Sequence, residues 1–309
     1  MSLHRAFTIY QFIPLTHHRS AIRMVKELLR EGIVPILDLE DSVSCLWDEE
    51  RNVALKAMAR AHLLSMAHLH QSIPNSENIL VRINQRDSKH HELDLQAIRE
   101  CYERGFPLGM VLSKTSSAEE LTACSRQMQA LIHRETPVIP IIESLSGVNA
   151  LEEILQSMPE ARRIAVFGYF DYALDAGHWP TLNQLEPHYW NLFNHLRNRA
   201  ELHNGILINS PHTRWQAPEE LAHIKAELLD HSQAPTGMCS IHRSQSQALL
   251  AEAQRLGQAP ATMMSDSEKA QWIIDAFESH RCHLRSFAVH DGYFVTPHEY
   301  QLAKRYLES

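Results

Sequence analysis

The sequence predicts an α/β protein with a (β/α)₈ barrel, or TIM barrel, and a C-terminal helical extension. Eight short apolar runs alternate with longer amphipathic segments along the chain. The runs lack the strict alternation of half-exposed strands, which is typical of parallel strands buried on both faces. The 309 residues also exceed the roughly 250 that such a barrel needs. Eight parallel strands alternating with helices close into a barrel.

The eight apolar runs are the expected strands. In chain order they cover residues 7–15, 34–40, 79–84, 109–114, 137–144, 163–168, 205–210 and 237–242. Amphipathic segments at 21–30, 48–69, 117–134 and 218–229 are expected to be helices between them. The segment at 117 opens with Ser-Ala-Glu-Glu, which places acids near the positive end of a helix dipole. The segment at 218 opens with Pro and two Glu, and Pro favours the first helical position.

Beyond the eighth run, the pattern predicts helices at 245–256 and 267–278 and a final segment at 287–308. No Pro-, Gly- or Ser-rich linker and no shift of composition divides the chain. We therefore expect a barrel over residues 1–256 and a helical extension over residues 257–309. The extension is expected to pack on the barrel or to reach a neighbouring subunit.

Charge and composition exclude several classes of protein. The net charge of −8 argues against binding to nucleic acids or to anionic membranes, which require a basic surface. No apolar run approaches the roughly 18–20 residues of a membrane helix, and the N-terminus lacks the small-residue cleavage site of a signal peptide. The five cysteines form no C-x-x-C pair, which is typical of reduced thiols. We expect a cytoplasmic protein.

Polar residues follow most of the apolar runs, at the barrel end where active sites lie. Several strand ends therefore bring charged groups to one rim, and such convergence predicts a binding or catalytic site. The charged residues are Asp38, Glu40 and Asp41 after the second run, Arg82 in the third, Lys114 after the fourth, Glu143 after the fifth and Asp171 after the sixth.

These residue types indicate a chemistry. Glu143 and Asp171 lie on adjacent strand ends, and Mg²⁺ takes one or two protein carboxylates while it keeps several waters. Arg82 offers a planar fork for a substrate carboxylate or an enolate oxygen. A metal and an Arg beside a carbonyl stabilise an enolate, the intermediate of aldol and Claisen cleavage. Lys114 is expected to stay charged among these carboxylates and to form an imine poorly.

Six segments together resemble the citrate lyase β-subunit-like enzymes of the HpcH/HpaI aldolase superfamily. They occur in the family's order, and the resemblance spans about residues 7–306. It implies a Mg²⁺-dependent TIM barrel, usually a homo-trimer or hexamer, that cleaves or forms C–C bonds beside a carbonyl. Many members act on CoA thioesters. The segments are ILDLEDSV (36–43), VRIN (81–84), LSKTSSAEEL (112–121), PIIESLSG (140–147), FGYFD (167–171) and CSIHRSQ (239–245).

The resemblance also implies roles for individual residues. It assigns Glu143 and Asp171 as metal ligands. The acidic D-L-E-D segment matches one that holds the metal's waters and the neighbouring Arg. By position, the expected catalytic residues are Arg82, Glu40 and Asp41, and the expected substrate-binding residues are Arg19, Arg82, Lys114 and Asp38.

The sequence departs from the family pattern at four places, of which the segments LSKT and IHRSQ, for the family's L-P-K-V and I-H-P-x-Q, are two. The first-strand motif reads FIPLTHHRS and lacks the family's Gly and Asn. Thr296 stands where malyl-CoA-type lyases have an Asp that acts as acid or base in the neighbouring subunit's site. The acid or base is therefore unassigned, with Asp41 and a metal-bound water as candidates. Three functions stay open: a C–C lyase acting on a hydroxy acid or its CoA thioester, a thioester hydrolase, and a barrel retained as a binding or assembly subunit.

Overall fold

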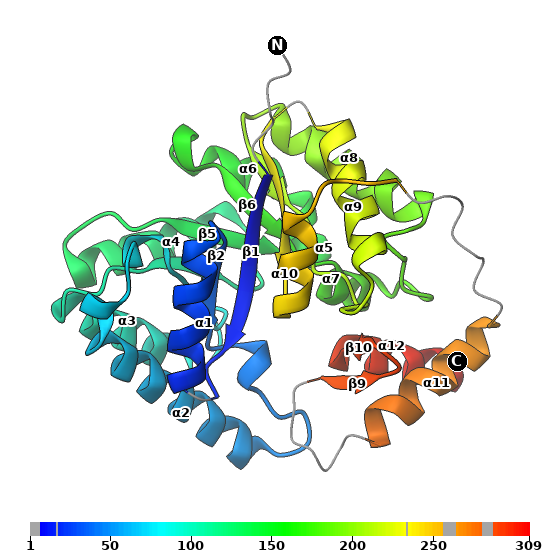
Figure 1. Ribbon diagram of the computed structural model, residues 1–309, viewed down its shortest axis with the longest axis horizontal. Coiled ribbons are helices and arrows are strands. Elements are labelled where there is room, and N and C mark those ends of the chain that lie inside the picture. The colour runs from blue at the N-terminus through cyan, green and yellow to red at the C-terminus, as the bar shows by residue number, and fades with distance from the viewer. Residues whose placement is uncertain (1–6, 17, 233, 256–263, 280–286) are drawn as a thin grey trace.

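The computed structural model describes residues 7–16, 18–232, 234–255, 264–279 and 287–309. Eight parallel strands stand in a ring with helices around them (Figure 1), which confirms the predicted TIM barrel. Every expected strand is present. The strands are β1 (Phe7–Pro14), β2 (Val34–Asp38), β3 (Leu80–Ile83), β4 (Gly109–Leu112), β5 (Val138–Ile142), β6 (Ile164–Phe167), β7 (Ile206–Ile208) and β8 (Thr236–Ser240).

The strands follow one another around the barrel in sequence order. The sheet order is β7-β6-β5-β4-β3-β2-β1-β8, with parallel pairing throughout. The barrel closes just after β7, where the Asn209 amide donates to the Gly237 carbonyl at 3.0 Å and its carbonyl accepts from the Cys239 amide at 2.9 Å. The carboxyl ends of all eight strands therefore meet at one rim.

Alternate residues of each strand enter two different cores, which explains the apolar runs. Ile36 and Val111 join a cluster inside the barrel. Their neighbours Leu37 and Leu112 join the larger core between the strands and the outer helices. Since both faces of a strand are buried, apolar residues occupy successive positions rather than every second one.

The barrel helices begin at the residues that favour helix starts. The Ser117 hydroxyl accepts from the Glu120 amide at 3.2 Å, and the Asp48 carboxylate accepts from the Arg51 amide at 3.0 Å. The helices are α1 (His18–Arg30), α2 (Glu49–Ala67), α3 (His91–Glu103), α4 (Ala118–Ile132), α5 (Leu145–Asn149), α6 (Leu151–Gln156), α7 (Tyr169–Ala176), α8 (Pro187–Glu201), α9 (Pro218–His231) and α10 (Arg243–Leu250).

The described part of the extension holds two helices, α11 (Asp266–Ser279) and α12 (Pro297–Glu308), and a hairpin that the sequence analysis missed. Strands β9 (Ala288–His290) and β10 (Tyr293–Val295) pair in antiparallel fashion. The turn residues Asp291 and Gly292 both have positive φ, 47° and 79°. Asp-Gly is favoured in such two-residue turns, and this dipeptide was the available signal.

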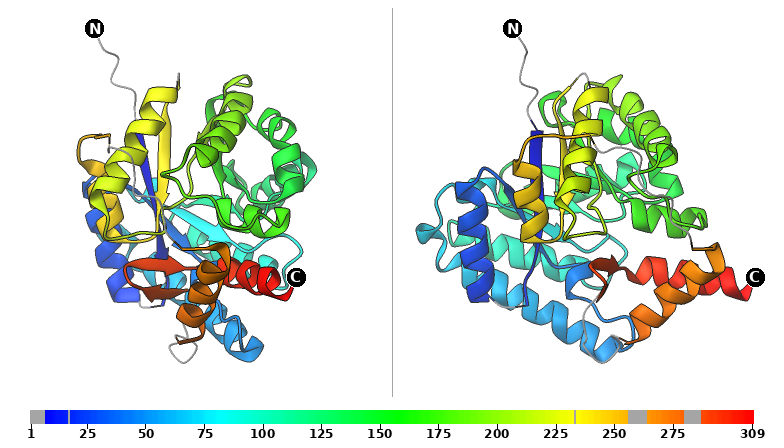
Figure 2. Two further views of the ribbon diagram at one scale, coloured as in Figure 1. Left: turned by 90° about the vertical axis from the view of Figure 1, so that its right-hand side faces the viewer. Right: turned by 45° about the vertical axis from the view of Figure 1, so that its right-hand side comes forward.

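The extension lies across the carboxyl end of its own barrel (Figures 1 and 2). The Phe294 amide donates to the Thr213 carbonyl at 2.9 Å, and the Tyr306 ring stacks on Trp179 with centroids 5.5 Å apart. These contacts bring β10 and α12 to the rim where the candidate site residues gather. A reach to a neighbouring subunit stays a prediction.

Two further sequence predictions concern the thiols and the membrane. Cys45, Cys101, Cys124 and Cys239 are free and buried, and Cys282 lies outside the described residues. Among the helices described here, none is long and apolar enough to span a bilayer.

Candidate active site

Three carboxylates surround the guanidinium of Arg82. Arg82 Nε and Nη2 donate to the two oxygens of Asp38 at 2.8 and 2.5 Å, a bidentate pair. Nη1 donates to Asp41 Oδ2 at 2.9 Å and lies 3.1 Å from Glu40 Oε2. The guanidinium carbon also lies 4.6 Å from the centroid of the Phe12 ring. The strand-end pattern therefore did bring these four charged residues together.

The acidic loop after β2 is held in place by backbone contacts. Asp38 accepts from the amides of Glu40 at 2.9 Å and Ser42 at 3.1 Å. From α2, the buried Lys56 donates to the carbonyls of Leu39 at 3.3 Å and Glu40 at 2.9 Å. These contacts fix the conformation of the loop.

The acids around Arg82 differ in protonation. Burial opposes the ionisation of Asp38 and Asp41, but the Arg82 charge and the hydrogen bonds to each carboxylate together outweigh burial and lower the pKa of both. Burial, and then the neighbouring Asp41, raise the pKa of Glu40 to about 8. At pH 7 Glu40 therefore keeps its proton while Asp38 and Asp41 are ionised. The retained proton reduces the negative charge that the three carboxyl groups place around the single guanidinium.

Glu143, after β5, and Asp171, in the first turn of α7, form the second acidic group. Glu143 Oε1 accepts from the Lys114 amide at 2.6 Å. A Cβ on Gly168 would lie 2.5 Å from Glu143 Oε2, so the glycine leaves the space this carboxyl occupies. Burial, and then the Asp171 charge, raise the pKa of Glu143 well above its usual range. The buried carboxyl of Glu143 beside the partly buried carboxylate of Asp171 forms a place where a cation would be stabilised.

Two cationic side chains contact the same oxygen of Asp171. Lys114 Nζ lies 3.1 Å from Oδ1, and His298 Nε2 lies 3.0 Å from it. Burial lowers the pKa of Lys114, but Asp171 and then Glu40 raise it above its usual value. Lys114 therefore stays charged, in line with the expectation that it forms an imine poorly. Sequence reasoning missed His298, because no strand-end pattern points to a residue on the extension.

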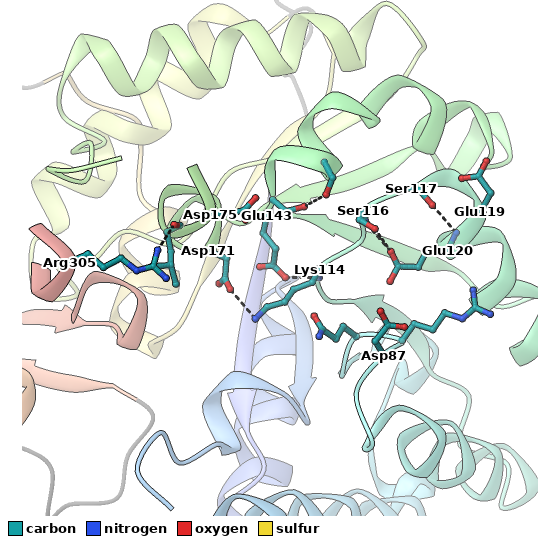
Figure 3. Close-up of a pocket in the computed structure, with 15 residues that line it drawn as sticks. Asp87, Lys114, Ser116, Ser117, Glu119, Glu120, Glu143, Asp171, Asp175 and Arg305 are labelled. Carbon is teal, nitrogen blue, oxygen red and sulfur yellow. Dashed lines mark hydrogen bonds and ion pairs between the residues drawn. The ribbon is translucent and has the colours of Figure 1, made fainter. Parts of the chain in front are cut away.

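Two cavities meet at Glu143 and Asp171. The smaller, about 460 Å³, opens between the barrel and the extension, with apolar walls that include Phe12 and Phe294. Its polar lining includes Asp38, Asp41, Arg82, Asp171 and His298. The larger, about 830 Å³, is a polar groove between the loops after β3, β4 and β5. Both acidic and basic side chains line it. Figure 3 shows the Lys114 side chain reaching past Glu143 to Asp171 in this groove.

Two residues singled out by the resemblance lie elsewhere or have another role. Arg19 is exposed in the first turn of α1 and lines neither cavity, and its expected substrate-binding role stays a prediction. Thr296 caps α12: its hydroxyl accepts from the Glu299 amide at 3.1 Å, and Glu299 Oε2 accepts from the Thr296 amide at 3.1 Å. Thr-Pro-His-Glu is a capping-box sequence, so the residue in the family's Asp position starts a helix.

Comparisons with solved structures agree with the fold. RipC from Yersinia pestis is 28% identical, with 79% of this chain and 93% of that chain covered and a TM-score of 0.57. The Haloferax volcanii malate synthase pyruvate/acetyl-CoA complex is 15% identical and shares the fold at a TM-score of 0.74, with 99% and 91% covered. CitE from Mycobacterium tuberculosis, solved with magnesium and pyruvate, is 20% identical at a TM-score of 0.58, with 84% and 93% covered. No curated protein sequence matches the chain.

A family model settles the relationship that the structures suggest. The model described as HpcH/HpaI aldolase/citrate lyase matches residues 21–201, more than half of the chain. That stretch runs from α1 to α8 and contains the charged groups described around Arg82 and Glu143, apart from His298 on the extension. The chain is a divergent member of the HpcH/HpaI aldolase/citrate lyase family.

Proposed function

We propose that this protein is a Mg²⁺-dependent C–C lyase acting on a hydroxy acid or its CoA thioester. The observation that carries the proposal is the pair of acids, Glu143 and Asp171, at the junction of the two cavities. The donors fit Mg²⁺, because they are hard carboxylate oxygens and because this cation keeps several waters. No cluster of three or more His, Cys, Asp or Glu suited to a metal occurs in the described part of the chain. The protein would supply two ligands, and water and substrate the others.

A bound Mg²⁺ would supply positive charge beside the substrate carbonyl. The protein's own side chains would bind and orient the substrate. Arg82 has five N–H groups, of which the surrounding carboxylates leave at least one free. Because Arg82 lines the smaller cavity, that group is placed to bind a substrate carboxylate or the oxygen where negative charge develops.

We assign proton transfer to Glu40 and Asp41 acting as a pair. Asp41 lines the smaller cavity, whereas Glu40 lies behind it and lines neither cavity. Asp41 alone is a poor proton acceptor, because Arg82 lowers its pKa. Glu40, with a pKa of about 8, changes its proton close to neutral pH. At neutral pH the pair holds one proton, on Glu40, which would pass through Asp41 to the substrate, and the two groups would titrate as one unit.

Calorimetric titration of the metal-stripped protein with Mg²⁺ tests the metal site. We expect wild type to bind, and Glu143→Gln and Asp171→Asn to lose most of the affinity. Asp175→Asn is the matched control, since Asp175 is also on α7 and lines the groove but accepts from the Leu145 amide at 2.7 Å. Wild type that binds no Mg²⁺, or an Asp171→Asn variant that binds as well as Asp175→Asn, would refute the assignment.

Ligand titrations separate the three candidate functions. Pyruvate, glyoxylate, oxaloacetate and acetyl-CoA should be titrated with and without Mg²⁺. Keto-acid binding that depends on Mg²⁺, together with release of a keto acid from a malyl-type thioester, supports the lyase. Release of the free hydroxy acid alone would favour a thioester hydrolase, and metal binding without any turnover would favour a binding or assembly subunit. A trimer or hexamer in the cytoplasm stays part of the proposal, and light scattering checks the stoichiometry.

A further inference from the structure

Asp171 is held from two distant parts of the chain. Lys114 belongs to the loop after β4 on the barrel, whereas His298 belongs to the first turn of α12 on the extension. Both contact Oδ1 of Asp171, at 3.1 and 3.0 Å. The side chains of Asp171 and His298 are 14% and 15% exposed, so the contact is largely screened from water. His298 also lines the smaller cavity together with Arg82.

The position of His298 does not depend on Asp171 alone. Thr296 and Glu299 form the capping box that starts α12 just before and after it. Further along the helix, Arg305 donates to the Leu174 carbonyl at 3.4 Å, and Tyr306 stacks on Trp179. The start of α12 is therefore set by its own cap and its packing on the barrel, and it presents His298 to Asp171 as a fixed donor.

The groups facing His298 come from three elements. Asp171 on α7 and Asp41 after β2 attract a positive imidazole, and Lys114 after β4 repels it. With either charge, the Nε2–H can donate to Oδ1. A carboxylate ligand with one oxygen fixed in this way loses little further freedom when a cation binds its other oxygen.

We propose that His298 is a positioning residue that holds Oδ1 of Asp171 and leaves Oδ2 for the cation, so that the extension is a working part of the metal site. This inference rests on the Mg²⁺ site proposed above. The extension would thus contribute to the site through His298, and not through Thr296, whose hydroxyl caps α12. The role is exerted through Asp171 and requires no proton transfer by His298.

Calorimetric titration of the full chain with MgCl₂ tests this role. We expect His298→Ala to weaken Mg²⁺ binding about 10-fold or more, as for other residues that orient a metal ligand. His298→Gln keeps an N–H donor near the place of Nε2 and should recover most of the affinity. The matched control is His290→Ala, because His290 lies in β9 against Trp272 and Asp291, away from Asp171. Circular dichroism verifies that each variant is folded.

Four results of these titrations bear on the positioning role of His298. Unchanged or tighter binding by His298→Ala would overturn the proposal, as would equal weakening by His290→Ala, which would show that the extension had simply loosened. If Asp171→Asn loses Mg²⁺ while His298→Ala does not, the metal site is correct and the positioning role is wrong. If wild type binds no Mg²⁺, both proposals are refuted.

Discussion

Replacing Glu40 by Gln should change how the stability of the protein depends on pH. Glu40 is 8% exposed, and burial, followed by Asp41, raises its pKa from 4.5 to about 8. The unfolded chain releases this proton near pH 4.5, whereas the native protein keeps it until about pH 8. The native state therefore binds more protons over this interval, and the free energy of unfolding falls as pH rises through it. Gln carries no titrating proton, so the variant lacks this fall.

The size of the effect follows from the shift. One pKa unit corresponds to about 1.4 kcal/mol, so Glu40 lowers the stability of wild type by about 4 kcal/mol between pH 5 and pH 8. That is a large part of the roughly 5–15 kcal/mol that stabilises a typical domain. Gln preserves the contacts, since its oxygen can accept from the Asp41 amide, now 2.9 Å from Glu40 Oε2, and its amide can donate to the Asp41 carboxylate.

Urea unfolding followed by tryptophan fluorescence at pH 5, 6, 7 and 8 measures this difference. We expect Glu40→Gln and wild type to be close in stability at pH 5 and to diverge in favour of the variant by pH 8. Glu153→Gln is the control, because Glu153 is exposed on α6, and it should follow wild type at every pH. Parallel curves for Glu40→Gln and wild type would refute the claim that Glu40 is protonated at neutral pH.

Substitutions at three further positions test individual contacts by the same urea assay. Arg82→Ala leaves the fully buried Asp38 carboxylate uncompensated and should cost about 3–5 kcal/mol. Gly168→Ala places a Cβ 2.5 Å from Glu143 Oε2 and should cost about 1–3 kcal/mol and weaken Mg²⁺ binding, because that carboxyl must move. Thr296→Ala removes the cap of α12 and should cost about 1 kcal/mol, whereas Thr296→Asp should retain the cap and most of the stability.

The barrel could be predicted because its strands are buried on two sides. Ile36 and Leu37 enter different cores, so the whole of β2 is apolar and stands out from the flanking sequence. The β9–β10 hairpin gave a weaker signal, because each strand has three residues and only the Asp291-Gly292 turn marks it. Short strands stabilised mainly by packing on another unit carry little local pattern.

The site was predictable to the extent that it follows from the barrel topology. Asp38, Arg82, Glu143 and Asp171 meet because parallel strands deliver their carboxyl ends to one rim. The position of Arg19 in the first-strand motif did not predict its surroundings, since its side chain is exposed in the first turn of α1 and lines neither cavity. His298 could not be found in this way, because its approach to Asp171 depends on how the extension packs across the rim.

The acidic loop after β2 and the C-terminal extension both reduce the repulsion between carboxylates at the rim. The rim gathers Asp38, Glu40, Asp41, Glu143 and Asp171, and so many ionised carboxylates in a buried space would repel one another. Around Arg82 the repulsion is relieved by the retained proton on Glu40. Around Asp171 it is relieved by the Lys114 and His298 contacts, one from the barrel and one from the extension. Because His298 holds one oxygen of Asp171 in place, a cation bound at Glu143 and Asp171 and the docking of the extension should stabilise each other, and Mg²⁺ should raise the melting temperature of wild type more than that of His298→Ala.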